Sequence, residues 1–436
     1  MTKITFIGAG STVFAKNILG DAMLTPSLHE AHIALYDIDE ARLNESLSML
    51  HTINKNSNEN RATIEAYDNR KEALQDADFV INAIQVGGYK PSTVIDFEIP
   101  KKYGLKQTIG DTTGIGGIFR GLRTLPVMLE FAREMEEVCP EAWLLNYTNP
   151  MSILTLGILK ATKIKTVGLC HSVQVCVPEL FQHLGIKEDY DLDDFQWNIA
   201  GINHMAWLLN ITKNGEDFYP EIKRLAAEKE DPHPDSVRFE LMKHFGYYVT
   251  ESSEHNAEYH PYFIKEKYPE LIDRFQIPID EYLRRCVEQI KGWEHQRDEI
   301  VNNGELTHQR SREYASYIMD AITTGKPTVI AGNVLNTGLI TNLPQDSCVE
   351  VPCLVDKNGI QPTVVGDLPT QLAALNRTNI NVHQLTVEAA LTLDKEKIYQ
   401  AALLDPHTNS ELSIGDIKAM VDELIEAHGD YLPTYH

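Results

Sequence analysis

Lys3-Ile-Thr-Phe-Ile-Gly-Ala-Gly-Ser11 is the stretch of this chain that decides its fold. A short apolar run leads directly into a glycine turn, and the residues that follow, to about Met23, carry apolar side chains at helical spacing. A second apolar run, Ile33-Ala-Leu-Tyr-Asp37, ends in a carboxylate. We therefore predict a strand, a tight turn, a helix and a second, parallel strand, the first unit of a doubly wound sheet.

The same alternation continues along the first half of the chain. The uninterrupted apolar run at 78–85 is typical of a parallel strand that is buried on both faces. Further strands are expected at 62–67, 143–146 and 166–170, with helices at 70–76 and about 122–137. We predict an α/β fold with a Rossmann-like, doubly wound parallel sheet over residues 1–195.

Residues 196–436 are expected to form a C-terminal mixed α/β domain that binds substrate and mediates oligomerisation. Its pattern differs from that of the first half because long charged helical stretches replace the regular alternation. The expected elements are strands at 197–203 and 327–333, an antiparallel segment at 347–354, and helices at 220–245, 280–300 and 312–323.

Composition narrows the classes of partner. The chain has 436 residues with 39 basic against 63 acidic side chains, a formal net charge of −24, which repels nucleic acid and anionic lipid. No apolar stretch approaches the roughly 18 residues of a membrane span, and no cleavable apolar leader precedes the first strand. We expect a cytoplasmic protein whose six cysteines stay thiols, so that a special cysteine is a ligand or a nucleophile.

The glycine turn has the chemistry of a dinucleotide site. Gly8 and Gly10, followed by Ser11, let the backbone and the helix N-terminus approach a pyrophosphate. Asp37 ends the second strand, where a carboxylate can bond both hydroxyls of an unphosphorylated ribose, so NAD is predicted over NADP. Val13 stands where the fingerprint has its third glycine.

Two residues at separate strand ends could ligate a metal. Cys170 follows the predicted strand at 166–170, and His204 follows the strand at 197–203. One thiolate and one imidazole leave a divalent cation partly open to water or substrate, as in a catalytic site. Taken alone, the same pair also fits a buried thiol and a hydrogen-bonded histidine. Polar loops at 109–120, 146–150 and 251–259 follow apolar segments, as binding loops do.

Seven motifs in this order resemble glycoside hydrolase family 4, and the resemblance runs from residue 3 to about residue 430. Within the family the chain looks most like the bacterial α-galactosidases. The motifs are Gly8-Ala-Gly-Ser11, Gln85-Val-Gly-Gly88, Gly110-Asp111 with Gly116-Gly117, Asn146-Tyr-Thr-Asn-Pro150, Gly168-Leu-Cys-His-Ser172, Gly201-Ile-Asn-His204, and Asn342-Leu-Pro344 through Val349-Glu-Val-Pro352.

This resemblance implies an enzyme that uses NAD and Mn²⁺ to hydrolyse glycosides. The implied reaction is oxidation of the sugar at C3, elimination across C1 and C2, addition of water and re-reduction. Cys170 and His204 match the metal ligands of the family. His171 occupies the place of the acid that protonates the leaving oxygen, where members acting on phosphosugars usually have Asp or Asn. That departure implies an unphosphorylated α-hexoside, with an α-galactoside expected.

The resemblance also implies the remaining roles in the site. Asn149 resembles the contact to a substrate hydroxyl, and Asp111 resembles the carboxylate that raises the basicity of a tyrosine base. Tyr259 is the candidate for that base, with Glu258 and Tyr248 as alternatives. An α-glucosidase or α-galacturonidase of the same family is an alternative function, as are an NAD-dependent hydroxy-acid dehydrogenase and an NAD-binding sensor. A homodimer or homotetramer is expected.

Overall fold

The first six strands of the chain form a parallel sheet in the order β3-β2-β1-β4-β5-β6. The computed structural model describes residues 1–186 and 192–436. This strand order is the one found in dinucleotide-binding folds, so the predicted Rossmann-like α/β class is confirmed. The strands are β1 (Lys3–Ile7), β2 (His32–Tyr36), β3 (Thr63–Tyr67), β4 (Phe79–Asn82), β5 (Trp143–Asn146) and β6 (Lys165–Gly168).

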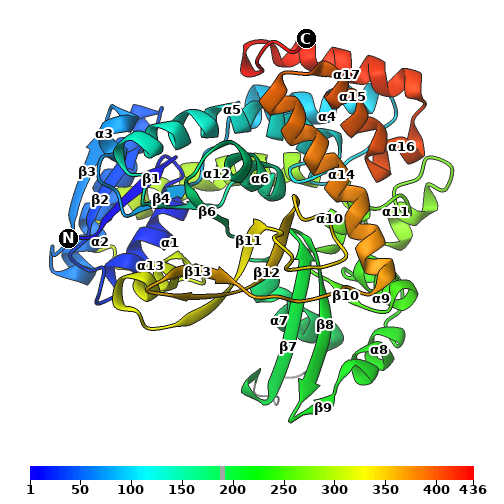
Figure 1. Ribbon diagram of the computed structural model, residues 1–436, viewed down its shortest axis with the longest axis horizontal. Coiled ribbons are helices and arrows are strands. Elements are labelled where there is room, and N and C mark those ends of the chain that lie inside the picture. The colour runs from blue at the N-terminus through cyan, green and yellow to red at the C-terminus, as the bar shows by residue number, and fades with distance from the viewer. Residues whose placement is uncertain (187–191) are drawn as a thin grey trace.

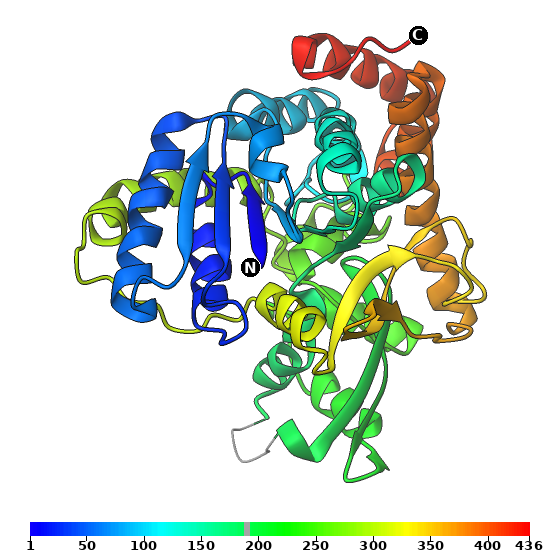
Figure 2. The same ribbon diagram turned by 60° about the vertical axis from the view of Figure 1, so that its left-hand side comes forward.

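Both faces of this sheet are covered, which explains why its strands are continuous apolar runs. Phe6 and Ile81 pack in one core cluster with α1 and α2, whereas Ile7 and Val80 pack in another with α5. Figures 1 and 2 show these helices on either side of the blue strands. The helices of the first half are α1 (Thr12–Met23), α2 (Glu40–Asn58), α3 (Arg70–Leu74), η1 (Gly88–Thr93), α4 (Val94–Lys102), α5 (Gly114–Val138), α6 (Met151–Ala161) and α7 (Ser172–Leu184).

The second half extends the same sheet with antiparallel strands, as predicted for 347–354. The extension joins β6 where Asn333 of β11 pairs with Gly168, and it continues through β12 to β7, β8 and β10. The green β7–β8 hairpin projects from the body of the molecule in Figure 1. These strands are β7 (Phe195–Ile202), β8 (Met205–Lys213), β9 (Glu216–Asp217), β10 (Tyr248–Val249), β11 (Thr328–Leu335), β12 (Cys348–Asp356) and β13 (Gly359–Pro362). Because one sheet crosses both halves, the domain boundary near residue 195 stays a prediction.

Two features of the helices differ from the sequence prediction. The stretch at 220–245 is two helices, α8 and α9, and the segment between them contains Pro232 and Pro234, which cannot donate the hydrogen bonds of a continuous helix. The predicted loop at 109–120 is already helical from Gly114. The helices of the second half are η2 (Leu192–Asp194), α8 (Tyr219–Ala227), α9 (Ser236–Phe245), α10 (Ser253–Tyr259), α11 (Glu270–Arg274), α12 (Glu281–Val301) and α13 (Ala315–Thr324).

Four C-terminal helices pack on the outside of the first half. α14 lies against α5 and α6, and α17 packs on α4, so the end of the chain closes over the sheet that its beginning forms. They are α14 (Thr370–Thr392), α15 (Lys395–Leu404), α16 (Pro406–Glu411) and α17 (Ile414–His428), followed by η3 (Gly429–Tyr431). Within the described ranges, no helix has both the length and the apolar composition that crossing a bilayer requires.

Candidate active site

The turn after β1 leaves no room for a side chain at Gly8 or Gly10. Gly8 has a φ of +91°, and a Cβ there would lie 2.8 Å from the carbonyl carbon and oxygen of Ala83 at the end of β4. The amide of Gly10 donates to Oδ2 of Asp37 at 2.7 Å, and a Cβ on Gly10 would lie 2.8 Å from that oxygen. Ser11 is the N-cap of α1 but makes no side-chain capping bond in the structure. The N-terminus of α1 therefore keeps amides available to an anion.

Val13, which replaces the third glycine of the fingerprint, does not obstruct this turn. Its side chain is 44% exposed, so it lies on the solvent side of α1, while Ala9 and Ala15 are the residues fully buried against the sheet. Asp37 is half-buried, and its Oδ1 accepts from the amide of Asp39 at 2.8 Å. The turn, the uncapped helix end and the strand-end carboxylate together fit a dinucleotide.

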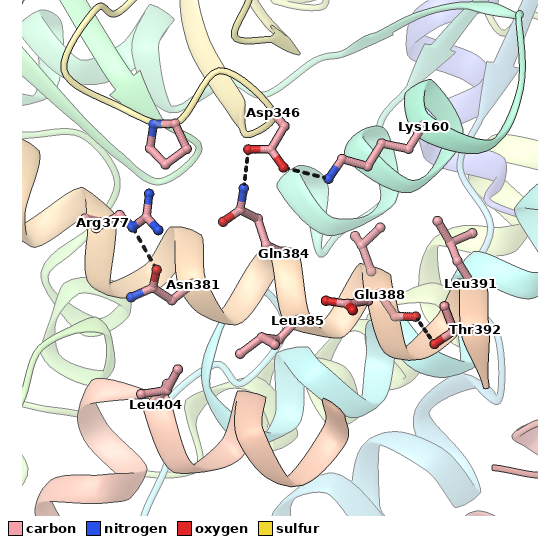
Figure 3. Close-up of a pocket in the computed structure, with 12 residues that line it drawn as sticks. Lys160, Asp346, Arg377, Asn381, Gln384, Leu385, Glu388, Leu391, Thr392 and Leu404 are labelled. Carbon is pink, nitrogen blue, oxygen red and sulfur yellow. Dashed lines mark hydrogen bonds and ion pairs between the residues drawn. The ribbon is translucent and has the colours of Figure 1, made fainter. Parts of the chain in front are cut away.

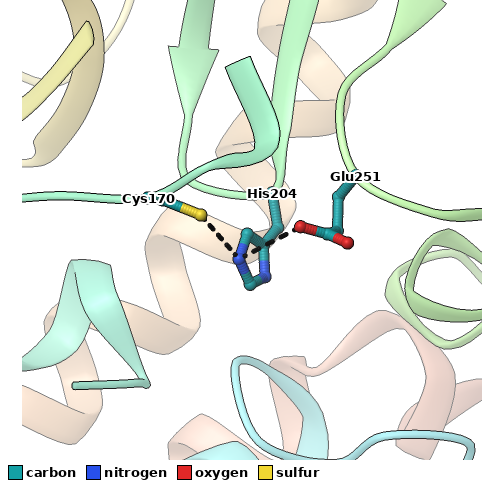
Figure 4. A group of neighbouring side chains, drawn as sticks. All are labelled: Cys170, His204 and Glu251. Carbon is teal, nitrogen blue, oxygen red and sulfur yellow. Dashed lines mark hydrogen bonds and ion pairs between the residues drawn. The ribbon is translucent and has the colours of Figure 1, made fainter. Parts of the chain in front are cut away.

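Cys170, His204 and Glu251 converge on one point, as Figure 4 shows. Cys170 follows β6, His204 occupies the turn of the β7–β8 hairpin with a φ of +61°, and Glu251 follows β10 with a φ of +64°. Nε2 of His204 lies 3.2 Å from Sγ of Cys170 and 3.4 Å from Oε2 of Glu251. The structure thus brings together the two predicted metal ligands and adds a carboxylate that the sequence analysis missed.

The electrostatics of this cluster favour a cation. Burial opposes protonation of His204, but Cys170 and Glu251 outweigh it and raise its pKa to about 10. Burial likewise disfavours the charged form of Glu251, but His255 and His204 outweigh it and lower its pKa to about 2. Thiolate, imidazole and carboxylate are donors for a divalent transition metal, and three of them leave coordination positions for substrate or water. The residues present therefore fit a catalytic metal.

The other ring nitrogen of His204 connects the cluster to two further side chains. Nδ1 lies 3.0 Å from Oγ1 of Thr112 and 3.1 Å from the hydroxyl of Tyr259. Thr112 in turn donates to Oδ1 of Asp111 at 2.7 Å. Burial, followed by the charges of Asp111 and Glu258, raises the pKa of Tyr259 well above its ordinary value. Tyr259 is therefore a neutral phenol in this arrangement, and a nearby divalent cation would lower its pKa.

Asp111 and Asn149 are hydrogen-bonded to each other, and Thr112 links Asp111 to His204. Nδ2 of Asn149 donates to Oδ2 of Asp111 at 3.3 Å, while Oδ1 of Asn149 is buried with no hydrogen-bond partner within the described residues. Burial raises the pKa of Asp111, but the charges of Arg120, His255 and His204 outweigh it, so the pKa is lowered overall. Asp111 is thus an ionised acceptor, and the free Asn149 oxygen suits a hydroxyl donor from a ligand.

His171 lies beside Cys170 and is paired with a carboxylate that the sequence analysis did not single out. Its Nε2 is 2.8 Å from Oε2 of Glu313, which raises the pKa of His171 against the opposing effect of burial. The side chain of His171 is 40% exposed, whereas that of Glu313 is 9% exposed. The arrangement orients an imidazole that retains its proton more strongly than a free histidine does.

The two alternative bases have other partners. Glu258 accepts from the amides of Thr108 at 2.8 Å and Gly110 at 2.7 Å, so it fixes the loop before Asp111. Tyr248 donates to Oδ2 of Asp235 at 2.6 Å and is fully buried. The geometry favours Tyr259 among the three candidates because Tyr259 alone of them contacts His204.

These groups share one edge of the sheet. Gly8, Asn149 and Cys170 follow β1, β5 and β6, and β1-β4-β5-β6 are parallel neighbours, so their carboxyl ends face the same side. At about 4.8 Å between strands, β1 and β6 lie roughly 14 Å apart. The glycine turn and the Cys170 cluster can therefore contact the two ends of one dinucleotide–substrate pair.

A separate pocket lies elsewhere on the molecule and shares no residue with this edge. It has a volume of about 540 Å³ and is lined by residues of α14, α6 and α15 and of the loop at 344–346 (Figure 3). Its polar side chains bond to one another, since Asp346 is 3.2 Å from Nζ of Lys160 and accepts from Gln384 at 2.7 Å. The titratable side chains predicted to act in catalysis are absent from its lining.

Comparison with known proteins places the chain among glycosidases. A model described as family 4 glycosyl hydrolase matches residues 3–186, and the model of that family's C-terminal domain matches residues 199–408. An α-galactosidase of Bacillus subtilis is 63% identical over the full length of both chains, and an α-galactosidase of Rhizobium meliloti is 34% identical over 99% of this chain and 89% of its own. A 6-phospho-α-glucosidase from gut microorganisms, solved with NAD and Mn²⁺, has a TM-score of 0.82 at 22% identity, covering 100% of both chains. The predicted cofactors agree with that complex.

Proposed function

Because the chain belongs to family 4 of the glycosyl hydrolases, which confirms the resemblance inferred from its motifs, we propose that it hydrolyses unphosphorylated α-galactosides with NAD and Mn²⁺. The observation that carries this proposal is the meeting of Cys170, His204 and Glu251 beside Asp111 and Asn149, on the sheet edge that also carries the glycine turn. The identity of 63% with an α-galactosidase supports the choice of sugar.

Gly8, Gly10, Ser11 and Asp37 would hold NAD, and Cys170 and His204 would hold Mn²⁺. When bound, NAD supplies reversible oxidation at C3 of the sugar, and Mn²⁺ acts as a Lewis acid on the C2 and C3 oxygens. Each remaining task falls to a side chain of the site: binding the hydroxyls, removing a proton at C2 and protonating the leaving group.

Asn149 and Asp111 bind and orient the sugar. The unpartnered Oδ1 of Asn149 accepts a hydrogen bond from a sugar hydroxyl. Asp111 holds the side-chain amide of Asn149 in place, because its Oδ2 accepts from Nδ2. Tyr259 removes the proton at C2, which the oxidised neighbouring carbon has made acidic. The electrons of the C2–H bond then form a double bond between C1 and C2, and the bond from C1 to the glycosidic oxygen breaks with its electron pair on that oxygen. Thr112 links Asp111 to Nδ1 of His204, next to the phenol, so the carboxylate supports the base from a short distance.

His171 protonates the departing oxygen. Glu313 holds its imidazole and raises its pKa, so His171 keeps its proton to higher pH than a free histidine does. Addition of water at C1, return of the proton to C2 and re-reduction at C3 complete the hydrolysis, so no net oxidation of the sugar accumulates. This separates the proposal from a hydroxy-acid dehydrogenase, which would accumulate reduced cofactor.

The hydrogen bonds of two arginines, Arg120 and Arg123, support the preference for an unphosphorylated sugar. Arg123 is fully buried and makes a bidentate pair with Asp96, at 3.1 and 2.6 Å. Arg120 donates to the carbonyl of Asn149 and to the hydroxyl of Tyr282. Both guanidinium groups are therefore committed to protein partners, and the net charge of −24 offers a phosphate no general attraction.

The test is a panel of nitrophenyl glycosides, each with and without a 6-phosphate, assayed with NAD, Mn²⁺ and a reductant. We expect kcat/KM for 4-nitrophenyl α-galactoside to exceed that for its 6-phosphate, and activity to vanish after removal of NAD or chelation of metal. A ratio below one would overturn the substrate class, and full hydrolysis by chelated, NAD-free protein would overturn the mechanism.

Better turnover of the α-glucoside or the α-galacturonide would change only the sugar within the same family. The assembly into a homodimer or homotetramer and the cytoplasmic location stay predictions.

A further inference from the structure

We propose that Glu251 is a third protein ligand of the divalent metal and that it holds the metal before any substrate arrives. This inference rests on the metal requirement of the proposed function, and it assigns a residue that the family motifs do not include. Three observations carry it: the spacing of the donor atoms, the way the carboxylate is held, and the match between the donor set and manganese.

Nε2 of His204 has the spacing of a neighbouring ligand to each of the other two donor atoms. Metal bonds of about 2.0–2.3 Å to nitrogen, oxygen and sulfur, meeting at a right angle, separate adjacent donors by about 2.8–3.3 Å. Nε2 of His204 lies 3.2 Å from Sγ of Cys170 and 3.4 Å from Oε2 of Glu251, and all three donors lie within 4.8 Å of one another. Bonds to manganese are slightly longer than bonds to zinc, which accounts for the 3.4 Å between His204 and Glu251.

The two oxygens of Glu251 have separate environments. Oε1 accepts from the amide of Ser252 at 3.1 Å and lies 3.4 Å from Nδ1 of His255. Oε2 is the oxygen that faces His204, as Figure 4 shows. One oxygen is therefore anchored by the protein and the other is directed at the donor cluster, which is the arrangement of a monodentate ligand with an outer partner.

The backbone at Glu251 supports a functional reason for this placement. Its φ of +64° lies in the left-handed region, which disfavours a residue with a side chain such as glutamate. His204 has a φ of +61° and incurs the same kind of strain. Strained residues that converge on one point are typical of sites where geometry is held for chemistry.

The donor set is compatible with manganese. A thiolate with an imidazole is a set that also suits zinc, whereas carboxylate and water oxygens suit Mn²⁺. Adding Glu251 gives two anionic ligands for a doubly charged ion, so the bound site is neutral in a buried setting. The remaining positions stay open to two sugar oxygens or to water.

The experiment measures Mn²⁺ binding without NAD or substrate, on protein stripped with a chelator, by following the free Mn²⁺ signal in electron paramagnetic resonance. Loss of an outer partner typically weakens metal affinity 10–100-fold, so Glu251→Gln, which removes a direct ligand, should raise the Kd by about 100-fold. Glu254→Gln is the matched control: it removes the same charge three residues away, where the side chain pairs with Arg285. Its Kd should stay within about threefold of the parent.

A second readout separates ligation from simple loss of negative charge. Co²⁺ bound to the parent should give ligand-field absorption bands that change in Glu251→Gln and stay unchanged in Glu254→Gln. A weaker Kd with unchanged Co²⁺ bands would mean an electrostatic role and would overturn the assignment, as would an unchanged Kd. If Glu251→Gln does not fold, Glu251→Asp retains the charge but shortens the reach, and its Co²⁺ bands should also shift; unchanged bands would again overturn ligation.

These outcomes are independent of the proposed function. If the parent protein hydrolyses α-galactosides and its Glu251→Gln variant binds metal normally, only the assignment of Glu251 as a ligand is refuted. Metal binding through Glu251 in a protein that hydrolyses no α-galactoside would remove only the proposed substrate.

Discussion

Replacing Gly8 with alanine should damage both the fold and the NAD site, because two separate costs meet at that position. The φ of +91° disfavours any side chain by about 1–2 kcal/mol. The new Cβ would also lie 2.8 Å from backbone atoms of Ala83, so β1 and β4 would have to separate, and such overpacking costs about 1–3 kcal/mol. Alanine also lowers the conformational entropy of the unfolded chain, which offsets about 0.4–1 kcal/mol of the lost stability.

The net loss is therefore about 1–4.6 kcal/mol, which is below the roughly 5–15 kcal/mol that stabilises a typical folded protein, so Gly8→Ala should still fold. Gly215→Ala is the matched control: Gly215 also has a positive φ, of +86°, but a Cβ there would meet nothing within 4 Å. The free energy of unfolding of Gly215→Ala should fall only by the conformational cost of its positive φ. The difference between the two variants in the free energy of unfolding measures the collision with β4.

Urea unfolding followed by fluorescence gives the stability, and calorimetric titration with NAD gives the affinity. We expect Gly8→Ala to lose more stability than Gly215→Ala and to bind NAD at least tenfold more weakly, while Gly215→Ala binds it normally. Equal stability losses in the two variants, together with unchanged NAD affinity in Gly8→Ala, would refute the role assigned to the turn.

The other predictions concern the reaction groups. Glu313→Gln should move the basic limb of the kcat/KM profile to lower pH, because the carboxylate raises the pKa of His171 and the acid must be protonated to act; a profile that superimposes on the parent's would contradict this. Cys170→Ser should lose bound manganese and nearly all turnover while His204 stays in place, and metal analysis of the purified variant checks it; the parent should inactivate slowly in air and recover with reductant and Mn²⁺. Tyr259→Phe should lower kcat by about 10²–10⁴-fold and abolish deuterium incorporation at C2 of the product in D₂O, followed by NMR; retained exchange would assign the base elsewhere.

The parallel sheet was predictable because its signal is local. Each strand buried on both faces is a continuous apolar run, and the glycine turn between β1 and α1 has the same meaning wherever it occurs. The start of α5 was not predictable, since Gly114 to Gly117 look like a loop. A Cβ at Gly116 would lie 2.4 Å from the carbonyl oxygen of Gly110, so these glycines permit close packing of the helix on its own preceding loop. That contact cannot be inferred from propensity.

The candidate site was predictable only in part for a related reason. Cys170, His171 and His204 follow strand-like segments, so their place at the sheet edge follows from the pattern. Glu251 and Glu313 come from segments whose paths depend on tertiary contacts, and nothing local distinguishes them from other acidic residues in an acidic chain. The one available signal for Glu251 was its position after the short apolar segment at 248–249, within an acid- and histidine-rich loop.

The β7–β8 hairpin supplies part of the proposed metal site to the proposed dinucleotide-binding sheet. Strands β1 and β2 are followed by the glycine turn and by Asp37, but of the three clustered donors strands β1 to β6 supply only Cys170. His204 is at the hairpin turn, and Glu251 follows β10, which pairs with β8 through Val249 and Trp207. Two of the three donors therefore depend on one antiparallel extension that reaches the parallel sheet through β11 and β12. A change that loosens this extension should release metal without weakening NAD binding, which separates the two cofactor sites physically.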